Sequence, residues 1–289
     1  MAQAINTLVE KGLRDRWDSA GPEPEAPAIE HLCEAAVVAI REANRKGRLA
    51  ELREFWPPYH SALIEHLEKH GRAIPVVCLL ADGSIVARIG APYEDGEVML
   101  IQGNRAQVVP DVPYFGRCPN RRYFGLVRHG GIEVTDGWGG ATVGYFPWPT
   151  GVEDMPTGCS MEPWDFEPKP SVVIPFPDMD ERIVLLEDGS RVYAGASRHE
   201  ELIIGDASGY VRAFSLSGER RWQQFSGSSV GSIDVSPDGR TMVATTCAGF
   251  LSNFQLDAGY QAPHQIGDGN HLEQRRWIFW KGEETALIW

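Results

Sequence analysis

The sequence predicts a mainly β fold assembled from repeated hairpins, on two observations. Residues 202–214 and 242–254 share one pattern: an apolar run, a polar turn closed by glycine, and an alternating apolar strand. The two turn glycines, Gly209 and Gly249, lie 40 residues apart. A fixed period of about 40–45 residues with four short strands per unit is typical of a β-propeller. We therefore expect a β-propeller of four or five blades, preceded by a small α-helical domain.

Fainter copies of the hairpin extend the repeat in both directions. Residues 123–138 and 277–289 each contain an apolar strand, a glycine turn and a second strand, the last with its turn at Lys281-Gly282. Asp-Gly pairs mark three further turns, and because Gly, and to a lesser degree Asp, tolerates a positive φ, we expect two-residue type I′ turns there. The pairs are Asp82-Gly83, Asp188-Gly189 and Asp238-Gly239.

The first 70 or so residues have a different, helical periodicity. Apolar residues spaced three and four apart predict an amphipathic helix over residues 27–46, which Gly47 would end. Its apolar face comprises Ile29, Leu32, Cys33, Ala36, Val37 and Ile40. We also expect short helices over 3–17 and 48–55, and a helical restart after Pro57-Pro58 that places Leu67 on an apolar face. The expected division is a helical domain over 1–72 and a propeller over 73–289.

Residues 145–177 interrupt the repeats with eight prolines. Proline cannot donate to a sheet ladder, so the pattern predicts a long inter-blade loop. Aromatic residues ringed by carboxylates in and just after this loop are typical of a protein interface. A solvated loop that only maintains solubility is the alternative. The candidate partner-binding residues are Trp148, Glu162, Trp164, Asp165, Phe166, Glu167, Asp178, Asp180 and Glu181.

The charge balance bears on the class of partner. The chain has 27 basic and 40 acidic residues, a net charge of −13. A surface of this sign repels phosphate backbones, so we expect no binding to nucleic acid, and it attracts basic proteins. We find no apolar run long enough to span a bilayer, and we expect no signal peptide. The five cysteines are scattered rather than paired in motifs. A cytoplasmic protein with no membrane association is therefore expected.

Three sequences could suggest catalysis or metal binding, and each has a simpler structural explanation. Gly227–Gly231 matches GxSxG around Ser229, but a predicted strand follows the serine where a nucleophile elbow needs a helix. His66 and His70 lie one helical turn apart without the HExxH pattern or a third ligand. His129-Gly130-Gly131 fits a hairpin turn. With no Walker or dinucleotide-binding motif present, we expect no catalytic residue, no metal and no cofactor.

Two segments resemble known propeller families. Residues 229–244, with Ser236-Pro237-Asp238-Gly239 between two strands, resemble a WD-repeat blade. Residues 206–222, with Gly209, Gly218 and Trp222, are similar to a blade of quinoprotein-like propellers. The chain is too short for the eight blades usual in quinoproteins, so a bound quinone is not implied. These resemblances imply architecture and leave the activity open.

The overall organisation resembles immunity proteins that bacteria keep against their own secreted toxins, including type VI secretion effectors. That resemblance implies a non-catalytic protein that neutralises a cognate toxin with a basic, nuclease domain. Two alternatives remain open: a WD-type scaffold for cytosolic proteins, and a propeller hydrolase or lyase. The oligomeric state and the mode of inhibition are left open as well.

Overall fold

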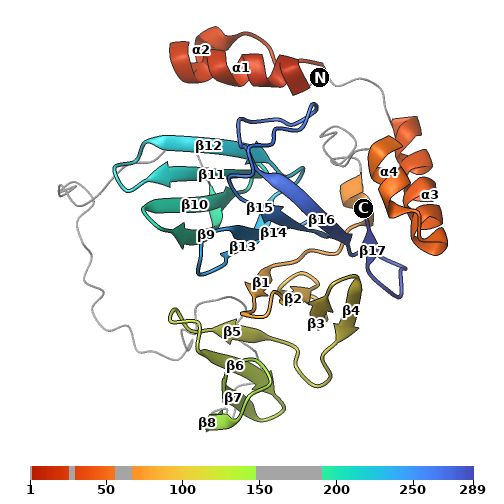
Figure 1. The fold of residues 1–289 in the computed structure, drawn as a ribbon, viewed down its shortest axis with the longest axis vertical. Helices are drawn as coiled ribbons and strands as arrows, with labels where there is room; N and C mark the ends of the chain where they lie inside the picture. Colours follow the sequence, from red (N-terminus) through yellow and green to blue (C-terminus); the bar gives the residue numbers. More distant parts are fainter. Residues whose placement is uncertain (1, 26–29, 56–66, 148–190) are drawn as a thin grey trace.

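A computed structural model describes residues 2–25, 30–55, 67–147 and 191–289. Within these ranges the chain forms four antiparallel sheets of consecutive strands, three with four strands and one with five (Figure 1). Each sheet is a meander that begins at an inner strand, as in a propeller blade. The predicted mainly β fold, with a β-propeller and a small helical region before it, is confirmed.

The blades are numbered in chain order. Blade I contains β1 (Val76–Leu79), β2 (Ile85–Ile89), β3 (Glu97–Gln102) and β4 (Arg105–Val108). Blade II contains β5 (Phe115–Arg117), β6 (Tyr123–Arg128), β7 (Gly131–Asp136) and β8 (Thr142–Pro147). Blade III contains β9 (Val192–Arg198), β10 (Glu201–Asp206), β11 (Tyr210–Ser215) and β12 (Arg220–Phe225). Blade IV contains β13 (Val230–Val235), β14 (Thr241–Thr246), β15 (Phe250–Gln255), β16 (Leu272–Ile278) and β17 (Leu287–Ile288).

The four hairpins read from the sequence are all present. They correspond to β6–β7, β10–β11, β14–β15 and β16–β17, each paired antiparallel. Gly209 and Gly249 occupy the turns of the two clearest repeats with φ values of 85° and 82°. Positive φ costs glycine less than any other residue, which explains why both repeats close on this residue.

The expected type I′ geometry of the Asp-Gly turns is wrong for both pairs that the structure describes. Gly83 and Gly239 have positive φ, but Asp82 and Asp238 do not. In each turn the aspartate carboxylate instead accepts a hydrogen bond from the backbone N–H two residues on. This Asx-type bond favours a longer turn with only the glycine in the left-handed region. The third pair, Asp188-Gly189, lies outside the described residues.

The last blade packs beside the first. The inner strand β13 contacts β9 on one side and β1 on the other. Thr245 donates from Oγ1 to the carbonyl of Ile74 at 2.7 Å, and the Ile74 N–H donates to the carbonyl of Thr246 at 3.2 Å. A cluster of buried apolar residues spans blades I and IV, including Ile85, Val243 and Trp277. Blades far apart in sequence are therefore joined through their inner strands and a shared core.

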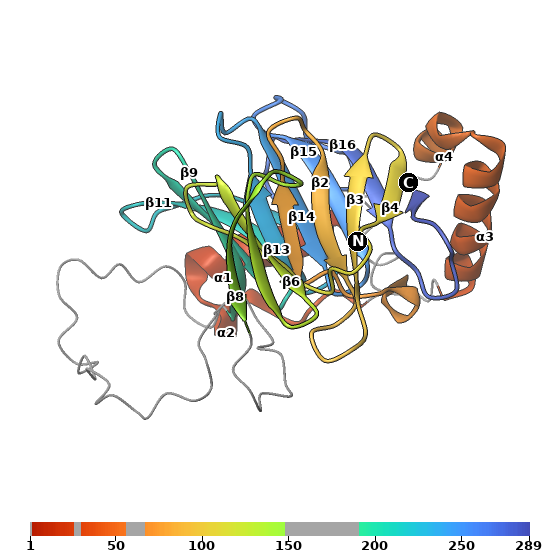
Figure 2. The same cartoon turned by 90° about the horizontal axis from the view of Figure 1, so that it is seen from below.

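The helices of residues 30–55 lie beside the outer strands of blade IV, whereas those of residues 2–20 lie beside β12 of blade III (Figures 1 and 2). The described helices are α1 (Ala2–Asp15), α2 (Trp17–Ala20), α3 (Glu30–Lys46), α4 (Leu49–Phe55) and the short 3₁₀ helix η1 (Glu68–His70). Helix α3 ends before Gly47, whose φ is 67°, as predicted. None of the helices in the described ranges has both the length and the apolar character needed to cross a bilayer.

The apolar face of α3 agrees with the prediction except at one residue. Cys33, Ala36, Val37 and Ile40 are each 1% exposed, whereas Leu32 is 39% exposed. The face of α3 that contacts blade IV is therefore narrower than the predicted apolar face. Leu32 lies at the edge of this contact. Ile29 lies outside the described residues.

Blade IV and α3 share one core, which also includes Phe250, Ile278 and Trp289. Asn44 of α3 pairs with the backbone of Ile288 in both directions, with N–O distances of 2.8 Å. The helix thereby covers the edge of β17 with its own hydrogen-bonding groups. The proposed domain boundary near residue 72 remains a prediction, but the helical segment and the propeller are in direct contact.

Candidate protein-binding surfaces

The partner-binding residues predicted from the sequence, Trp148 to Glu181, all lie outside the described residues. The structure corrects the start of the loop that the sequence predicts over residues 145–177. Tyr145, Phe146 and Pro147 are the last residues of β8, paired with Glu133, Ile132 and Gly131 of β7. The aromatic residues favour a pleated strand, and Pro147 is tolerated because β8 is an edge strand.

Strand β8 is an exposed apolar edge. Val143 is 56% exposed, Tyr145 51% and Phe146 63%, although all three belong to one regular strand. Tyr145 and Phe146 are consecutive, so their side chains point to opposite faces of blade II. On its outer side β8 pairs with no other strand of the described chain. Within the described residues, large apolar side chains therefore flank backbone groups of β8 that pair with no strand, on both faces of the sheet.

The outer strands of the other three blades are either covered by another segment or carry a charge. Strand β17 is covered by Asn44 of α3, as described above. Strand β12 is covered by the segment before β16, in which Ile266 accepts a hydrogen bond from the Phe225 N–H at 3.0 Å. Asn6 of α1 in turn binds this segment at Gln265 and Gly267. Strand β4 is exposed but begins with a charged residue, Arg105, whereas β8 contains no charged residue. Charges on an edge discourage strand addition, so β8 is the edge best suited to pairing.

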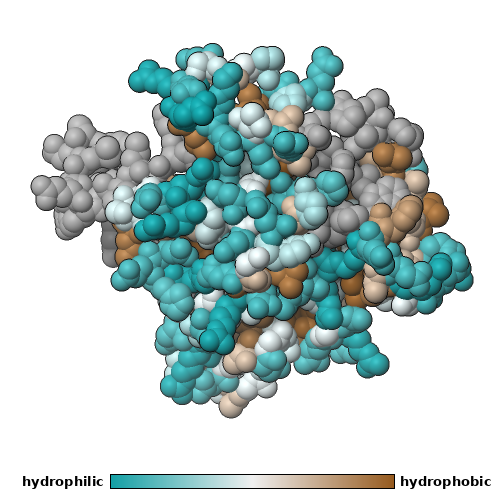
Figure 3. All heavy atoms as spheres, turned by 45° about the horizontal axis from the view of Figure 1, so that its top comes forward, coloured by the Kyte–Doolittle hydropathy of each residue, from teal (hydrophilic) through white to brown (hydrophobic). Residues whose placement is uncertain are grey.

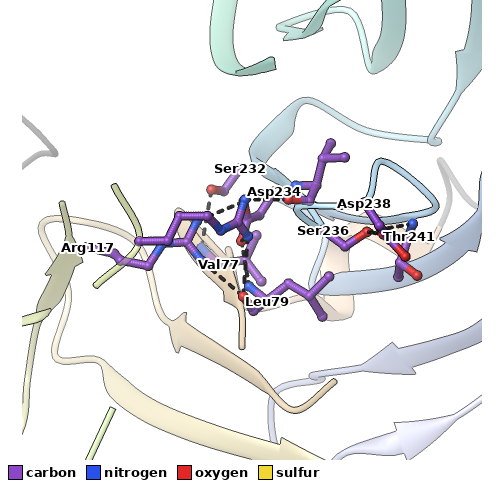
Figure 4. Close-up of polar contacts among 10 residues, drawn as sticks. Val77, Leu79, Arg117, Ser232, Asp234, Ser236, Asp238 and Thr241 are labelled. Atoms are coloured by element: carbon purple, nitrogen blue, oxygen red, sulfur yellow. Dashed lines mark hydrogen bonds and ion pairs between the residues drawn. The ribbon is translucent and has the colours of Figure 1, made fainter. Parts of the chain in front are cut away.

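A buried carboxylate joins three blades (Figure 4). Asp234 of β13 is 6% exposed. It accepts hydrogen bonds from the N–H of Leu79 in β1 at 2.6 Å and from Arg117 of β5 at 2.9 Å. Arg121, in the β5–β6 turn, donates to the same carboxylate at 3.0 Å and also to the carbonyl of Val235.

The two arginines are held by this single carboxylate. Burial alone would lower the pKa of Arg117, but the hydrogen bond and charge of Asp234 raise it above its ordinary value. Arg121 has a φ of 64°, a left-handed conformation that costs a non-glycine residue about 1–2 kcal/mol. Its hydrogen bonds to Asp234 and Val235 of blade IV, and to the Leu79 carbonyl of blade I at 3.4 Å, offset that cost. The network therefore fixes blade II to the rest of the propeller.

We call the side of the propeller that carries the β1–β2, β5–β6, β9–β10 and β13–β14 turns the turn face. An open pocket of about 960 Å³ lies on it. Residues of the β9–β10 and β11–β12 turns line the pocket, together with Asp257 from the segment after β15. Viewed from the side shown in Figure 3, the surface is mostly hydrophilic with small, separated hydrophobic patches.

A buried histidine lies behind Asp257. His271 is 2% exposed, packs edge-on against Trp222 with ring centroids 4.3 Å apart, and accepts the Asp257 N–H through Nδ1 at 3.2 Å. Burial, more than the neighbouring charges, lowers the pKa of His271 to about 4. The imidazole is therefore neutral near pH 7 and its proton lies on Nε2.

The three sequences considered for catalysis or metal binding have structural roles where they are described. Ser229 precedes strand β13, not a helix, and donates to the carbonyl of Ala207 at 2.6 Å. His129 and Gly130 form the β6–β7 turn, with Gly130 at φ 92°. His70 packs against Trp280, with ring centroids 5.7 Å apart, while His66 lies outside the described residues. Within the described ranges, no group of three or more His, Cys, Asp or Glu residues is placed to hold a metal ion.

Comparison with known proteins returned no matching family model and no matching curated protein. Among solved structures, the chain is similar to the β-propeller domain of Cps50 (Swd1) from Myceliophteria thermophila. The two share 12% identity over 75% of this chain and 69% of the other, with a TM-score of 0.27. The propeller assignment made above comes from the sheet topology of this chain.

We expect Asp234→Asn to destabilise the fold strongly. The substitution leaves the largely buried Arg117 and the partly exposed Arg121 without a counter-charge, and breaking a buried ion pair costs about 3 kcal/mol or more. Chemical denaturation would measure the loss in free energy of unfolding. Asp238→Asn, in the turn that follows β13, is the matched control and should lose much less. Equal losses for the two variants would contradict the role assigned to Asp234.

His271 makes stability depend on pH. Because the pKa is about 4 in the folded state against an ordinary 6.5, the unfolded chain binds the proton first as pH falls. The free energy of unfolding is therefore unaffected by the titration of His271 above pH 6.5. As the pH falls from 6.5 to 4 it decreases, by about 3 kcal/mol for a shift of this size. His271→Asn keeps an acceptor for the Asp257 N–H and cannot titrate.

Denaturation curves between pH 7 and 4.5 test this expectation. The His271→Asn variant should show a flatter dependence than the wild type. His129→Gln, at an exposed turn, should leave the slope unchanged. Parallel curves for wild type and His271→Asn would show that the histidine is not buried in its neutral form.

Proposed function

We propose that this protein is a non-catalytic binding protein that engages a basic protein partner, and that the partner is a cognate bacterial toxin with a nuclease domain. The observation that carries the proposal is the exposed apolar edge of β8. Aromatic side chains that protrude from a rigid scaffold supply the buried area on which protein interfaces depend. Propellers in general serve as binding platforms, although the fold by itself does not fix a function.

The net charge supports a basic partner. A charge of −13 raises the rate of encounter with a basic protein and disfavours nucleic acid. A nuclease presents a basic cleft to phosphates, and an acidic protein that lies in or beside this cleft would deny access to the substrate. The toxin as the specific partner rests on the likeness in overall organisation to bacterial immunity proteins.

A strand from the partner is the mode of contact that fits β8 best. A partner that offered only side chains would cover one face of blade II, yet Tyr145 and Phe146 are exposed on opposite faces. An added strand pairs with the open backbone groups and places its alternate side chains against both faces. The candidate residues between Trp148 and Glu181 follow β8 directly in the chain and remain proposed contacts.

Capture of the partner from the native cell lysate tests the proposal. The tagged chain should retain one stoichiometric, basic protein in about 0.5 M salt, which screens exposed charge contacts. Tyr145→Ser combined with Phe146→Ser should reduce its retention by at least about tenfold, because large apolar anchors are worth about 2 kcal/mol or more. Val108→Ser, on the other exposed edge strand β4, is the matched control, since Val108 is 54% exposed.

Growth assays then distinguish a toxin from other partners. Expression of the captured protein alone should arrest growth, and co-expression of the wild-type chain should restore it. The Tyr145→Ser, Phe146→Ser variant should restore growth poorly. Capture of several partners at lower occupancy, without toxicity, would favour a scaffold and overturn the toxin proposal.

A further inference from the structure

The pocket on the turn face has the chemistry of a site for a basic side chain. It lies where the β9–β10 turn and the β11–β12 turn of blade III meet Asp257 of blade IV. Its volume, about 960 Å³, exceeds what one long side chain requires, and the pocket is open to solvent. A residue on a partner protein could therefore enter without rearrangement of the turns.

The back of the pocket is held in place by an arginine that is already engaged. The side chain of Arg198 is 10% exposed and donates from Nε to the carbonyl of Gly239 at 2.7 Å. It also forms ion pairs with Glu201, at 3.2 Å, and with Asp257. The charge of Arg198 is thus offset within the wall, which also fixes the two carboxylates.

The charged groups that line the pocket carry one more negative than positive charge. Glu200, Glu201 and Asp257 contribute three carboxylates, against the guanidinium groups of Arg198 and Arg221. Arg221 is itself paired with Glu219 at 3.4 Å, outside the lining. The side chain of Asp257 remains 54% exposed, and a carboxylate has acceptor sites for more than one donor. The Arg198 guanidinium already bridges Glu201 and Asp257, so the acceptors open to a further cation are the exposed side of Asp257 and the exposed Glu200.

Leu216 adds an apolar wall to this charged pocket. It lies in the β11–β12 turn and is 69% exposed, at a position where turns normally carry polar residues. The hydroxyls of Ser215 and Ser217 on either side are bonded to each other at 2.8 Å. Arginine and lysine combine an aliphatic stem with a terminal cation, which is the pairing of surfaces that this pocket offers.

We propose that the pocket binds an arginine or lysine side chain of the protein partner, with its stem on Leu216 and its cation at Glu200 and the exposed side of Asp257. This inference rests on the proposed function in one respect, namely that the partner is a basic protein. It adds a second contact on blade III, separate from the edge of blade II. The pocket would fix the register of the partner, since exposed charge pairs contribute more to specificity than to affinity.

A titration of the full-length chain with N-acetyl-arginine amide tests the pocket without the partner. The Leu216 methyl resonances should shift and saturate, and N-acetyl-glutamate amide should leave them unchanged. Asp257→Asn should abolish the saturable shift. Asparagine suits this position because Asp257 has a φ of 52°, which Asn tolerates better than other non-glycine residues. No saturable shift with the arginine probe, or an equal shift in Asp257→Asn, would overturn the proposal.

Leu216→Ser serves as a second variant, because an exposed turn residue can be replaced without loss of the fold. It should weaken retention of the captured partner at least threefold, and retention unchanged from wild type would overturn the proposal. If the wild-type chain captures a basic partner but shows no saturable response to the arginine probe, the proposed pocket is rejected and the proposed function stands. Saturable probe binding in a chain that captures no basic protein would instead reject the proposed function.

Discussion

The contact between Asp234 and the arginines of blade II is the interaction on which the arrangement of the blades depends. Each blade is locally complete, because its strands follow one another in sequence and pair through short turns. The relation between blades is not local, and in this molecule one carboxylate binds a backbone N–H of blade I and two guanidinium groups of blade II. Buried charges of this kind contribute less net stability than their number suggests, but they require one geometry. They fix where β8 and the turn face lie relative to the other blades.

The N-terminal helices cover outer edges of the propeller. A propeller blade ends in an outer strand with open backbone groups, which is a liability in a soluble protein. Two asparagines from the helical segment address this problem in a similar way: Asn44 pairs with the edge of β17, and Asn6 fastens the segment that covers β12. Blade II has no such cover among the described residues, and its outer strand is apolar. The contrast within one chain is the physical basis for treating β8 as an interface.

Much of the fold could be predicted from the sequence because its signals are local. The glycines at 209 and 249, the alternating strands around them and the helical stripe of α3 are each set by neighbours a few residues away. The type I′ expectation was wrong because the carboxylates of Asp82 and Asp238 bind nearby backbone groups, a choice that the Asp-Gly pair alone does not reveal. The exposure of Leu32 depends on how widely α3 contacts blade IV, which is a tertiary property.

The candidate sites were harder to predict for the same reason. Nothing in the sequence indicates that Asp234 lies beside Arg117 and Arg121, more than 100 residues earlier in the chain. Arg198, Leu216 and Asp257 meet in one pocket only because blades III and IV are adjacent. The apolar run at Tyr145 and Phe146 was visible, but the neighbouring prolines assigned it to a loop. The sequence signal for an open edge at β8 was an uncharged segment with two aromatic residues that ends in proline.

Hydrogen–deuterium exchange on the isolated, full-length chain tests the central claim most directly. If β8 is an open edge on a rigid blade, its alternate, outward amides exchange rapidly, while the inward amides that pair with β7 are protected. The Ile288 amide, bound by Asn44, should exchange slowly in the same sample. Protection of all β8 amides to the level of Ile288 would show that this edge is already covered and would contradict the account.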